Sequence, residues 1–216
     1  MSRFTHLIFD LDGTLVDSKA DLAAATNVML ASFGLMPLSI EQVTSYIGDG
    51  ARVLVERALG PEHVHLVPHG FTVFMEYYRA HLLDYTRPYD GIPQLLAAVQ
   101  AQGIVLSVLT NKPEAPSWTI LAGVGLARFF HAVIGGDTLS VRKPDPRGVT
   151  YLQQLSGIPL VQTLLIGDSR IDMETGRAAG IATCGVTWGF GAAGLVTTPP
   201  EFVVDTTEEL RRVILR

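Results

Sequence analysis

The chain has 216 residues, of which 48% are hydrophobic and 17% charged, and its formal net charge is −5 at pH 7. These values exclude a disordered chain and are typical of one globular domain, or of a core domain that carries a smaller insertion. The negative charge and the lack of a Lys/Arg cluster argue against nucleic acid as a partner, whereas a small anionic substrate could still bind at a local cationic site.

Nothing in the sequence predicts export or a membrane partner. The first residues lead directly into an apolar segment and show no signal-peptide pattern. Residues 22–40 carry no charge and have the length of a membrane span, but Asn27, Gly34 and Pro37 argue against one. The single cysteine, Cys184, rules out a disulfide within the chain, which is typical of a reducing compartment. We therefore expect a cytoplasmic protein.

The first predicted strand is the apolar segment 6–9, which is short and is followed by the turn signal Asp12-Gly13. Beyond it, apolar residues recur at helical spacing up to about residue 85, with no convincing strand between them. This helical interval is too long for a crossover connection within a sheet. The sequence therefore predicts a core domain of residues 1–16 and 86–216, and a small all-helical cap domain of residues 17–85 inserted after strand one.

Five further apolar segments are predicted strands, and helical patterns separate most of them. Pro93 is placed at a first helical turn, Asp145 is a candidate N-cap, and Thr206 with Glu209 forms a capping-box pattern. Strands that alternate with helices predict an α/β fold with a doubly wound parallel sheet. The five predicted strands are residues 105–109, 132–134, 163–166, 182–186 and 202–204.

Polar residues follow four of the predicted strands, directly or a few residues later. Ligands of open α/β sheets bind outside the carboxyl ends of the strands, so we expect these residues to form one site. They are Asp10 and Asp12, Thr110 and Asn111, Lys143, and Asp168 with Asp172.

The chemistry of these residues suits a phosphate ester. Three acids can hold a hard divalent cation such as Mg²⁺, and a hydroxyl, an amide and an ammonium remain to bind phosphate oxygens. Asp10 could attack phosphorus, while Asp12 could protonate the leaving oxygen and then deprotonate water. Repulsion between the two neighbouring carboxylates favours the protonated form of Asp12 that this role requires.

The four segments, in this order, resemble the haloacid dehalogenase superfamily of phosphotransferases. The family pattern is Asp-x-Asp-Gly-Thr, then Ser or Thr, then Lys, then Gly-Asp-x-x-x-Asp, and the resemblance covers essentially the whole chain, including a helical cap. It implies an aspartyl-phosphate intermediate on Asp10, with Asp12 as general acid and base. It further implies that the Asp10 side chain, the Asp12 carbonyl and Asp168 hold Mg²⁺. Thr110 and Lys143 would bind the phosphoryl group, and Asp172 would orient Lys143 or a metal-bound water.

Finer features resemble the bacterial phosphoglycolate phosphatases within that superfamily. These are the segments 110–113 (Thr-Asn-Lys-Pro), 134–138 (Ile-Gly-Gly-Asp-Thr) and 46–51 (Tyr-Ile-Gly-Asp-Gly-Ala). The resemblance implies hydrolysis of 2-phosphoglycolate to glycolate and phosphate. Asp49 stands where these proteins usually have Asn. Arg52 is a candidate second contact for a doubly anionic substrate, although a solvated arginine fits its helical setting better.

Several alternatives stay open on the sequence. The scaffold also suits a phosphatase with another substrate, an inorganic pyrophosphatase or a phosphosugar mutase. Carbon–halogen hydrolysis needs neither Asp12 nor Mg²⁺, and carbon–phosphorus cleavage needs a lysine in the cap, where Lys19 is the only one. A non-enzymatic phosphoryl-accepting module, as in signalling receivers, would carry adjacent acids and no insertion after strand one. The sequence does not choose between a monomer and a homodimer.

Overall fold

The computed structural model describes residues 3–215, so that Met1, Ser2 and Arg216, which belong to the predicted core domain, lie outside it. Its main feature is a six-stranded sheet in which every pair of neighbouring strands is parallel. The strand order is β5-β4-β1-β6-β7-β8. The strands are β1 (His6–Phe9), β4 (Val105–Leu109), β5 (Ala132–Ile134), β6 (Thr163–Gly167), β7 (Ala182–Val186) and β8 (Phe202–Val204). All six predicted strands are confirmed.

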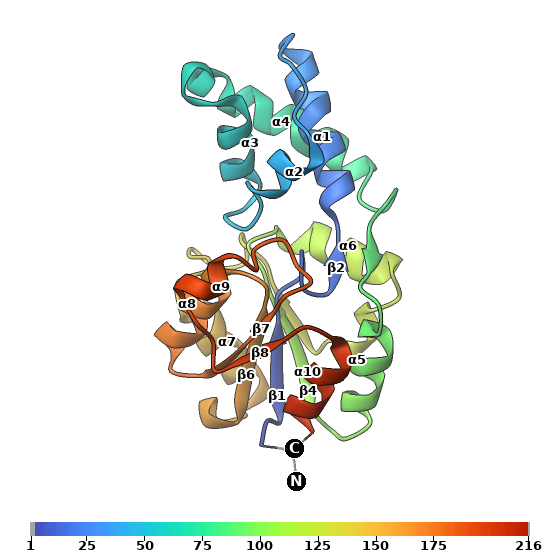
Figure 1. The fold of residues 1–216 in the computed structure, drawn as a ribbon, viewed down its shortest axis with the longest axis vertical. Coiled ribbons are helices and arrows are strands. Elements are labelled where there is room, and N and C mark those ends of the chain that lie inside the picture. Colours follow the sequence, from blue (N-terminus) through green and yellow to red (C-terminus); the bar gives the residue numbers. More distant parts are fainter. Residues whose placement is uncertain (1–2, 216) are drawn as a thin grey trace.

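Helices cover both faces of this sheet (Figure 1). They are α5 (Ile92–Gln100), α6 (Glu114–Gly123), α7 (Arg147–Ser156), α8 (Arg170–Ala179), α9 (Gly194–Thr197) and α10 (Thr207–Ile214), with short 3₁₀ turns η2 (Ala127–Phe129) and η3 (Leu160–Gln162). Side chains along a strand point to alternate faces, so β1 contributes to two apolar clusters. Leu7 packs in the cluster that contains Leu96 and Leu210, whereas Ile8 packs in the cluster of Val149 and Leu152. The predicted doubly wound α/β fold is confirmed.

Two predicted helix starts differ from the structure in detail. Pro146, not Asp145, is the N-cap of α7, but Asp145 still accepts a hydrogen bond from the Arg147 backbone N–H at 2.9 Å. At α10 the Thr206 hydroxyl accepts from the Glu209 N–H, as predicted, whereas the Glu209 carboxylate accepts from Asp205 instead of Thr206. In both cases the observed N-cap or hydrogen-bond donor lies one residue from the predicted one. Such shifts are common at helix starts, where several neighbouring N–H groups compete for one acceptor.

Four helices lie between two short strands, β2 (Val16–Asp17) and β3 (Arg87–Pro88), that pair antiparallel. They are α1 (Lys19–Ser32), α2 (Ile40–Thr44), α3 (Ala51–Leu59) and α4 (Val67–Ala80), with the 3₁₀ turn η1 (Pro61–Leu66) before α4. We call them the helical unit. Figure 1 shows it above the carboxyl ends of the strands, and the predicted cap boundaries fall beside the β2–β3 pair.

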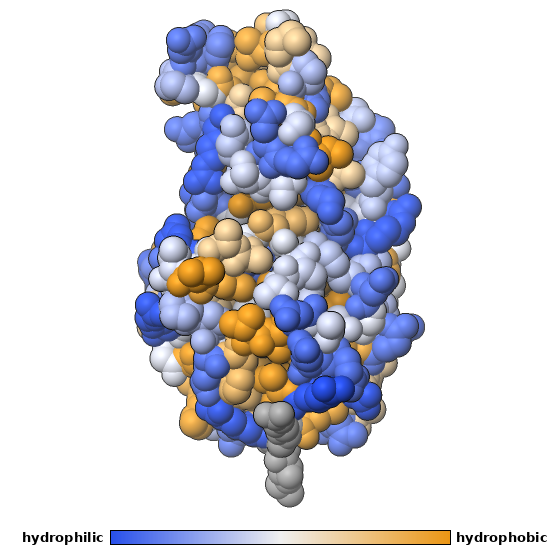
Figure 2. All heavy atoms as spheres, in the orientation of Figure 1, coloured by the Kyte–Doolittle hydropathy of each residue, from blue (hydrophilic) through white to orange (hydrophobic). Residues whose placement is uncertain are grey.

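The two connections to the helical unit are joined by one buried acid. Asp21, near the start of α1, accepts hydrogen bonds from the backbone N–H groups of Tyr85 and Thr86 and from the Thr86 hydroxyl. This holds the start of α1 against the returning chain. In the surface view of Figure 2, polar residues surround apolar patches, and the outline narrows between the helical unit and the sheet. No helix within residues 3–215 combines the length and the apolar character needed to cross a membrane.

Candidate active site

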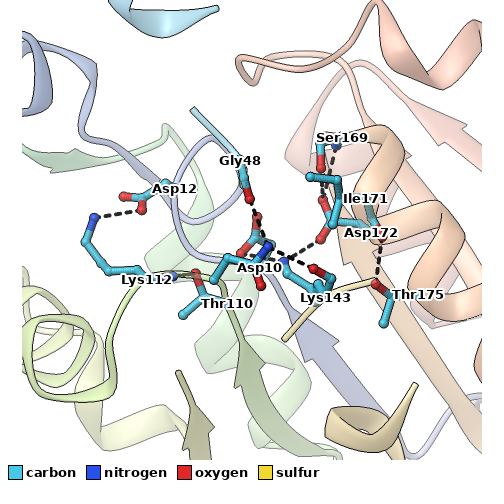
Figure 3. A network of polar contacts seen from close by, with 11 residues as sticks. Asp10, Asp12, Gly48, Thr110, Lys112, Lys143, Ser169, Ile171, Asp172 and Thr175 are labelled. Atoms are coloured by element: carbon cyan, nitrogen blue, oxygen red, sulfur yellow. Dashed lines mark hydrogen bonds and ion pairs between the residues drawn. The ribbon is translucent and has the colours of Figure 1, made fainter. Parts of the chain in front are cut away.

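A buried lysine lies between two carboxylates at the carboxyl end of β1 (Figure 3). Asp10 is the first residue after β1, which runs between β4 and β6, where the strand order reverses and α/β proteins bind ligands. The Lys143 Nζ atom lies 2.8 Å from Asp10 Oδ1 and 2.5 Å from Asp172 Oδ1. The Lys143 and Asp172 side chains are almost completely buried. Three residues that are far apart in the sequence therefore form one ion-pair cluster.

Burial and charge act against each other in this cluster. Burial alone would lower the pKa of Lys143, but the carboxylates of Asp10 and Asp172 raise it well above its ordinary value. The pKa of Asp10 is also raised, chiefly by burial and secondly by Asp172, although the Lys143 ammonium opposes this rise. The lysine is thus a permanent cation at the floor of the site.

Asp172 is held by the first turn of α8. Its Oδ2 atom accepts hydrogen bonds from the Ser169 hydroxyl at 2.6 Å and from the Ser169 N–H at 3.2 Å, which completes a capping box. A Cβ atom on Gly167 would lie 2.2 Å from Asp172 Cγ, so only glycine fits at the end of β6. The helix start therefore orients the carboxylate that holds Lys143.

Asp168 is oriented by a loop that follows β7. Its Oδ2 atom accepts hydrogen bonds from the backbone N–H groups of Phe190 at 2.6 Å and Gly191 at 3.0 Å. Burial, followed by the charges of Asp172 and Asp10, raises the pKa of Asp168 to about 7. The role of this loop was not predicted from the sequence. The glycine pair at 189 and 191 was the available signal, because a Cβ on Gly189 would lie 2.3 Å from that of Asp168.

The acids of the site form a donor set for a metal ion. Asp10, Asp168 and Asp172 each place a carboxylate oxygen within 4.8 Å of the others. Burial raises the pKa values of Asp10 and Asp168, and the neighbouring carboxylates raise them further. Oxygen donors of this kind suit a hard divalent cation, which would relieve the repulsion between the acids.

The Asp12 side chain lies apart from this acid cluster and makes its own ion pair. Asp12 Oδ2 lies 2.7 Å from Lys112 Nζ, and Asp12 Oδ1 accepts a hydrogen bond from the Ser18 hydroxyl at 2.5 Å. Figure 3 shows the Asp12–Lys112 pair beside the Lys143 cluster. From the sequence, Lys112 was only one residue of the segment 110–113, and its ion pair with Asp12 was not predicted.

Thr110 and Asn111 follow β4 and are both buried. The Thr110 hydroxyl accepts from the Lys112 backbone N–H at 3.2 Å. The Asn111 amide donates to the carbonyl oxygens of Gly48 at 3.0 Å and Lys143 at 3.1 Å. Asn111 thus connects the site to the loop between α2 and α3 of the helical unit.

A cleft opens between the site and the helical unit. The helical unit contributes mostly apolar side chains, and the sheet side contributes the polar ones. Arg52 is exposed on α3 and does not line the cleft, so its predicted substrate contact stays a prediction. Asp49 forms an ion pair with Arg57 at 2.6 Å, while its neighbours Gly48 and Gly50 line the cleft. Further lining residues are Asp10, Asp12, Leu22, Ile47, Leu54, Met75, Tyr78, Thr110, Asn111, Lys112, Asp168 and Phe190.

Comparison with known proteins agrees with this geometry. The family model of haloacid dehalogenase-like hydrolases matches residues 7–186, which include Asp10, Asp12, Lys143, Asp168 and Asp172. The chain belongs to this family. The predicted resemblance to the haloacid dehalogenase superfamily is therefore confirmed. In this hydrolase the helical unit lies between the first strand of the sheet and the remaining strands.

Several relatives of this hydrolase are named phosphoglycolate phosphatase. The protein from Neisseria meningitidis is 39% identical over 211 residues, which cover 94% of this chain and 90% of that protein. The protein from Pseudomonas fluorescens is 40% identical over 215 residues, covering 96% of this chain and 78% of that protein. A crystal structure from Haemophilus somnus, described as a predicted phosphoglycolate phosphatase, has a TM-score of 0.93 at 32% identity and covers 99% of both chains. The finer predicted resemblance is confirmed at the level of these relatives.

Proposed function

We propose that this haloacid dehalogenase-like hydrolase is a Mg²⁺-dependent phosphomonoesterase that converts 2-phosphoglycolate to glycolate and phosphate. The observation that carries the chemistry is the buried Asp10–Lys143–Asp172 cluster, which places a carboxylate and a permanent cation together at the floor of the cleft. The relatives named phosphoglycolate phosphatase support the choice of substrate.

In the first half of the reaction, an Asp10 carboxylate oxygen attacks phosphorus. The bond between phosphorus and the substrate's ester oxygen breaks, and Asp12 gives that oxygen a proton, which releases glycolate. Lys143 and Thr110 bind the phosphoryl oxygens and offset their charge. The product of this half is a phosphoryl group on Asp10.

In the second half, a water molecule attacks the same phosphorus. Asp12, now a carboxylate, takes a proton from that water, and the bond from phosphorus to Asp10 breaks. Phosphate leaves, and both acids return to their starting forms. Asp172 takes no direct part, because its two oxygens hold Lys143 and Ser169.

Asp10 and Asp168, together with the main-chain carbonyl of Asp12, would hold the Mg²⁺ ion. The ion would neutralise part of the phosphoryl charge and so favour attack by an anionic carboxylate. These residues fit the role, because Asp10 and Asp168 are carboxylates that place oxygens within 4.8 Å of each other.

The proposal is tested by phosphate release from 2-phosphoglycolate with purified protein, with and without Mg²⁺. We expect a kcat/KM on the order of 10⁴ M⁻¹s⁻¹ or more, within the usual range for an enzyme and its own substrate. Removal of divalent ions with a chelator should abolish the release, and Mg²⁺ should restore it.

Two results would contradict parts of the proposal. Release from a generic aryl phosphate but not from 2-phosphoglycolate would keep the phosphatase and reject the substrate. Phosphate that stays on the protein with single-turnover stoichiometry would reject hydrolysis altogether. A cytoplasmic location belongs to the same proposal and rests on the lone Cys184, which is buried.

A further inference from the structure

The mouth of the cleft has a polar corner that the mechanism above does not use. It consists of Lys112 and Tyr78, on opposite sides of the cleft. Lys112 follows β4 on the sheet side, and Tyr78 lies in the last turns of α4 in the helical unit. The Lys112 Nζ atom lies 4.8 Å from the centre of the Tyr78 ring, within the range of a cation–π contact. Both side chains are buried and both line the cleft.

Lys112 is the one lysine or arginine, within residues 3–215, that lines this cleft. Lys143 lies beneath the cleft, between Asp10 and Asp172, where its charge is already matched by two carboxylates. The other ion pairs in and next to the helical unit are at least partly exposed; they are Lys19 with Asp17, Asp49 with Arg57, and His81 with Asp84. A substrate with a second anionic group thus meets one cation beside the phosphoryl site.

The Tyr78 hydroxyl lies close to the Lys112 ammonium, which can only donate, and its proton has no acceptor among the described residues, although only 2% of the residue is exposed. A buried hydroxyl without a partner costs free energy, and most such groups in proteins are paired. Burial raises the pKa of Tyr78 to about 12, so the hydroxyl keeps its proton at neutral pH and can donate it in a hydrogen bond. It is a donor beside the Lys112 ammonium.

The connectivity of the proposed substrate matches this corner. In 2-phosphoglycolate the carboxyl carbon is joined to the ester oxygen through a single methylene group. Asp12, which protonates that oxygen, lies 2.7 Å from Lys112. When Asp12 faces the ester oxygen, a carboxylate one methylene away from that oxygen therefore lies near the Lys112 ammonium.

We propose that Lys112 and Tyr78 bind the carboxylate of the substrate and make this hydrolase selective for carboxylated phosphomonoesters. The proposal rests on the phosphatase function above. Lys112 donates to the carboxylate as an ammonium, and Tyr78 donates through its hydroxyl. Binding at this corner joins the sheet side of the cleft to the helical unit.

The same contact explains how Asp12 becomes available to the substrate. Both Asp12 oxygens are occupied in this structure, one by Ser18 and one by Lys112. A substrate carboxylate competes with Asp12 for the ammonium and frees one Asp12 oxygen, which takes up a proton from solvent and then faces the ester. A phosphomonoester without a carboxylate leaves the Asp12–Lys112 pair in place. Selectivity should therefore appear in kcat as well as in KM.

The test compares 2-phosphoglycolate with 2-hydroxyethyl phosphate, in which a hydroxymethyl group replaces the carboxylate. We expect the wild-type protein to favour 2-phosphoglycolate in kcat/KM by at least 10-fold. In Lys112→Met this preference should fall by roughly 10- to 100-fold, the range expected for one hydrogen bond to a charged group. Lys112→Arg should recover part of it. The exposed Arg79→Met, also on α4, is the matched control and should keep the full preference.

Tyr78→Phe guards against a variant that does not fold. It removes only the unpartnered hydroxyl and keeps the ring, so the melting temperature should hold or rise. We expect the preference for 2-phosphoglycolate to fall by about 10-fold. Tyr77→Phe, which alters a neighbouring tyrosine that does not line the cleft, should leave it unchanged.

The outcomes separate this inference from the proposed function. Equal losses on both esters in Lys112→Met and an unchanged preference in Tyr78→Phe would overturn the inference and leave the phosphatase intact. A wild-type protein that hydrolyses both esters equally well would do the same. A wild-type protein that hydrolyses neither would overturn the proposed function itself.

Discussion

The two ends of strand β1 treat a buried ionisable side chain in opposite ways. At the amino end, His6 lies between two serines, with Ser107 at 3.0 Å and Ser156 at 3.3 Å from its ring nitrogens. Burial, followed by the nearby His131, lowers its pKa to about 4, so the ring is neutral at physiological pH. At the carboxyl end, Asp10 stands against a buried ammonium and further acids.

The difference teaches where this fold keeps charge. A neutral group whose hydrogen bonds are satisfied costs little when it is buried, and His6 is of that kind. The carboxyl end instead keeps charged groups in the interior, where the Lys143 ammonium lies between the carboxylates of Asp10 and Asp172. We therefore expect changes at the carboxyl end to affect catalysis, and changes at the amino end to affect only stability.

The largest expected effect comes from Asp10→Asn. An amide is a poor nucleophile, so kcat for phosphate release should fall by at least about 10⁴-fold, comparable to losses seen on removing other enzymes' nucleophiles. The matched change at the other end of the strand, His6→Gln, should keep kcat within about threefold. Steady-state assays of both variants check this. Substantial turnover by the Asn variant would show that Asp10 is not the attacking group.

Lys143→Met should break the charge balance of the carboxyl end. It leaves Asp10 and Asp172 buried without their cation, so unfolding in urea at pH 8 without Mg²⁺ should show a loss of about 3–5 kcal/mol. Lys19→Met removes a lysine from the exposed pair with Asp17 and should cost less than about 1 kcal/mol. Similar losses in the two variants would mean that Lys143 is not needed to balance the acids.

The buried His6 at the amino end of β1 should make the free energy of unfolding depend on pH. Between pH 6.5 and about 4 the unfolded chain binds a proton at His6 that the folded protein does not. The free energy of unfolding should therefore fall as the pH falls through this window, by up to about 3 kcal/mol in all. His6→Gln should lose this component, so the difference between the two urea-unfolding curves isolates it. Parallel pH profiles would contradict a neutral buried histidine.

The smallest expected effect concerns the space beside the acids. A Cβ at Gly13, where φ is +83°, would lie 2.3 Å from Asp168 Oδ2. Gly13→Ala should displace this carboxylate and raise the Mg²⁺ concentration for half-maximal activity by about tenfold, or roughly 1.4 kcal/mol. Gly34→Ala is the control, because φ is +68° there and no atom lies within 4 Å. Both should lose about 1 kcal/mol of stability through backbone strain, but only Gly13→Ala should change the metal response.

Local patterns in the sequence predicted much of this molecule. Short apolar segments such as 105–109 and 182–186 are strands at the predicted bounds, because buried parallel strands read as continuous apolar runs. The four polar segments after strands were expected at one edge, and the structure brings Asp10, Lys143, Asp168 and Asp172 together there. This outcome could be predicted from local patterns, because the carboxyl ends of parallel strands lie at the same edge of the sheet.

Other contacts depend on the tertiary structure. Lys112 pairs with Asp12 across 100 positions of the chain, and the loop at Phe190 orients Asp168 across 22. Neither pairing leaves a periodic signal, because side-chain partners at such separations are chosen by packing and not by local propensity.

The sequence by itself determined the order of strands and helices, the insertion of a helical unit and the residue types that carry the chemistry. These follow from apolar periodicity and from acids placed at strand ends, which act within a few residues. Only the tertiary structure decided that Lys112 pairs with Asp12, that Asp49 pairs with Arg57, and that Lys112 and Tyr78 share the cleft. The physical reason is that a buried charge must find an opposite charge in three dimensions, wherever the fold places one.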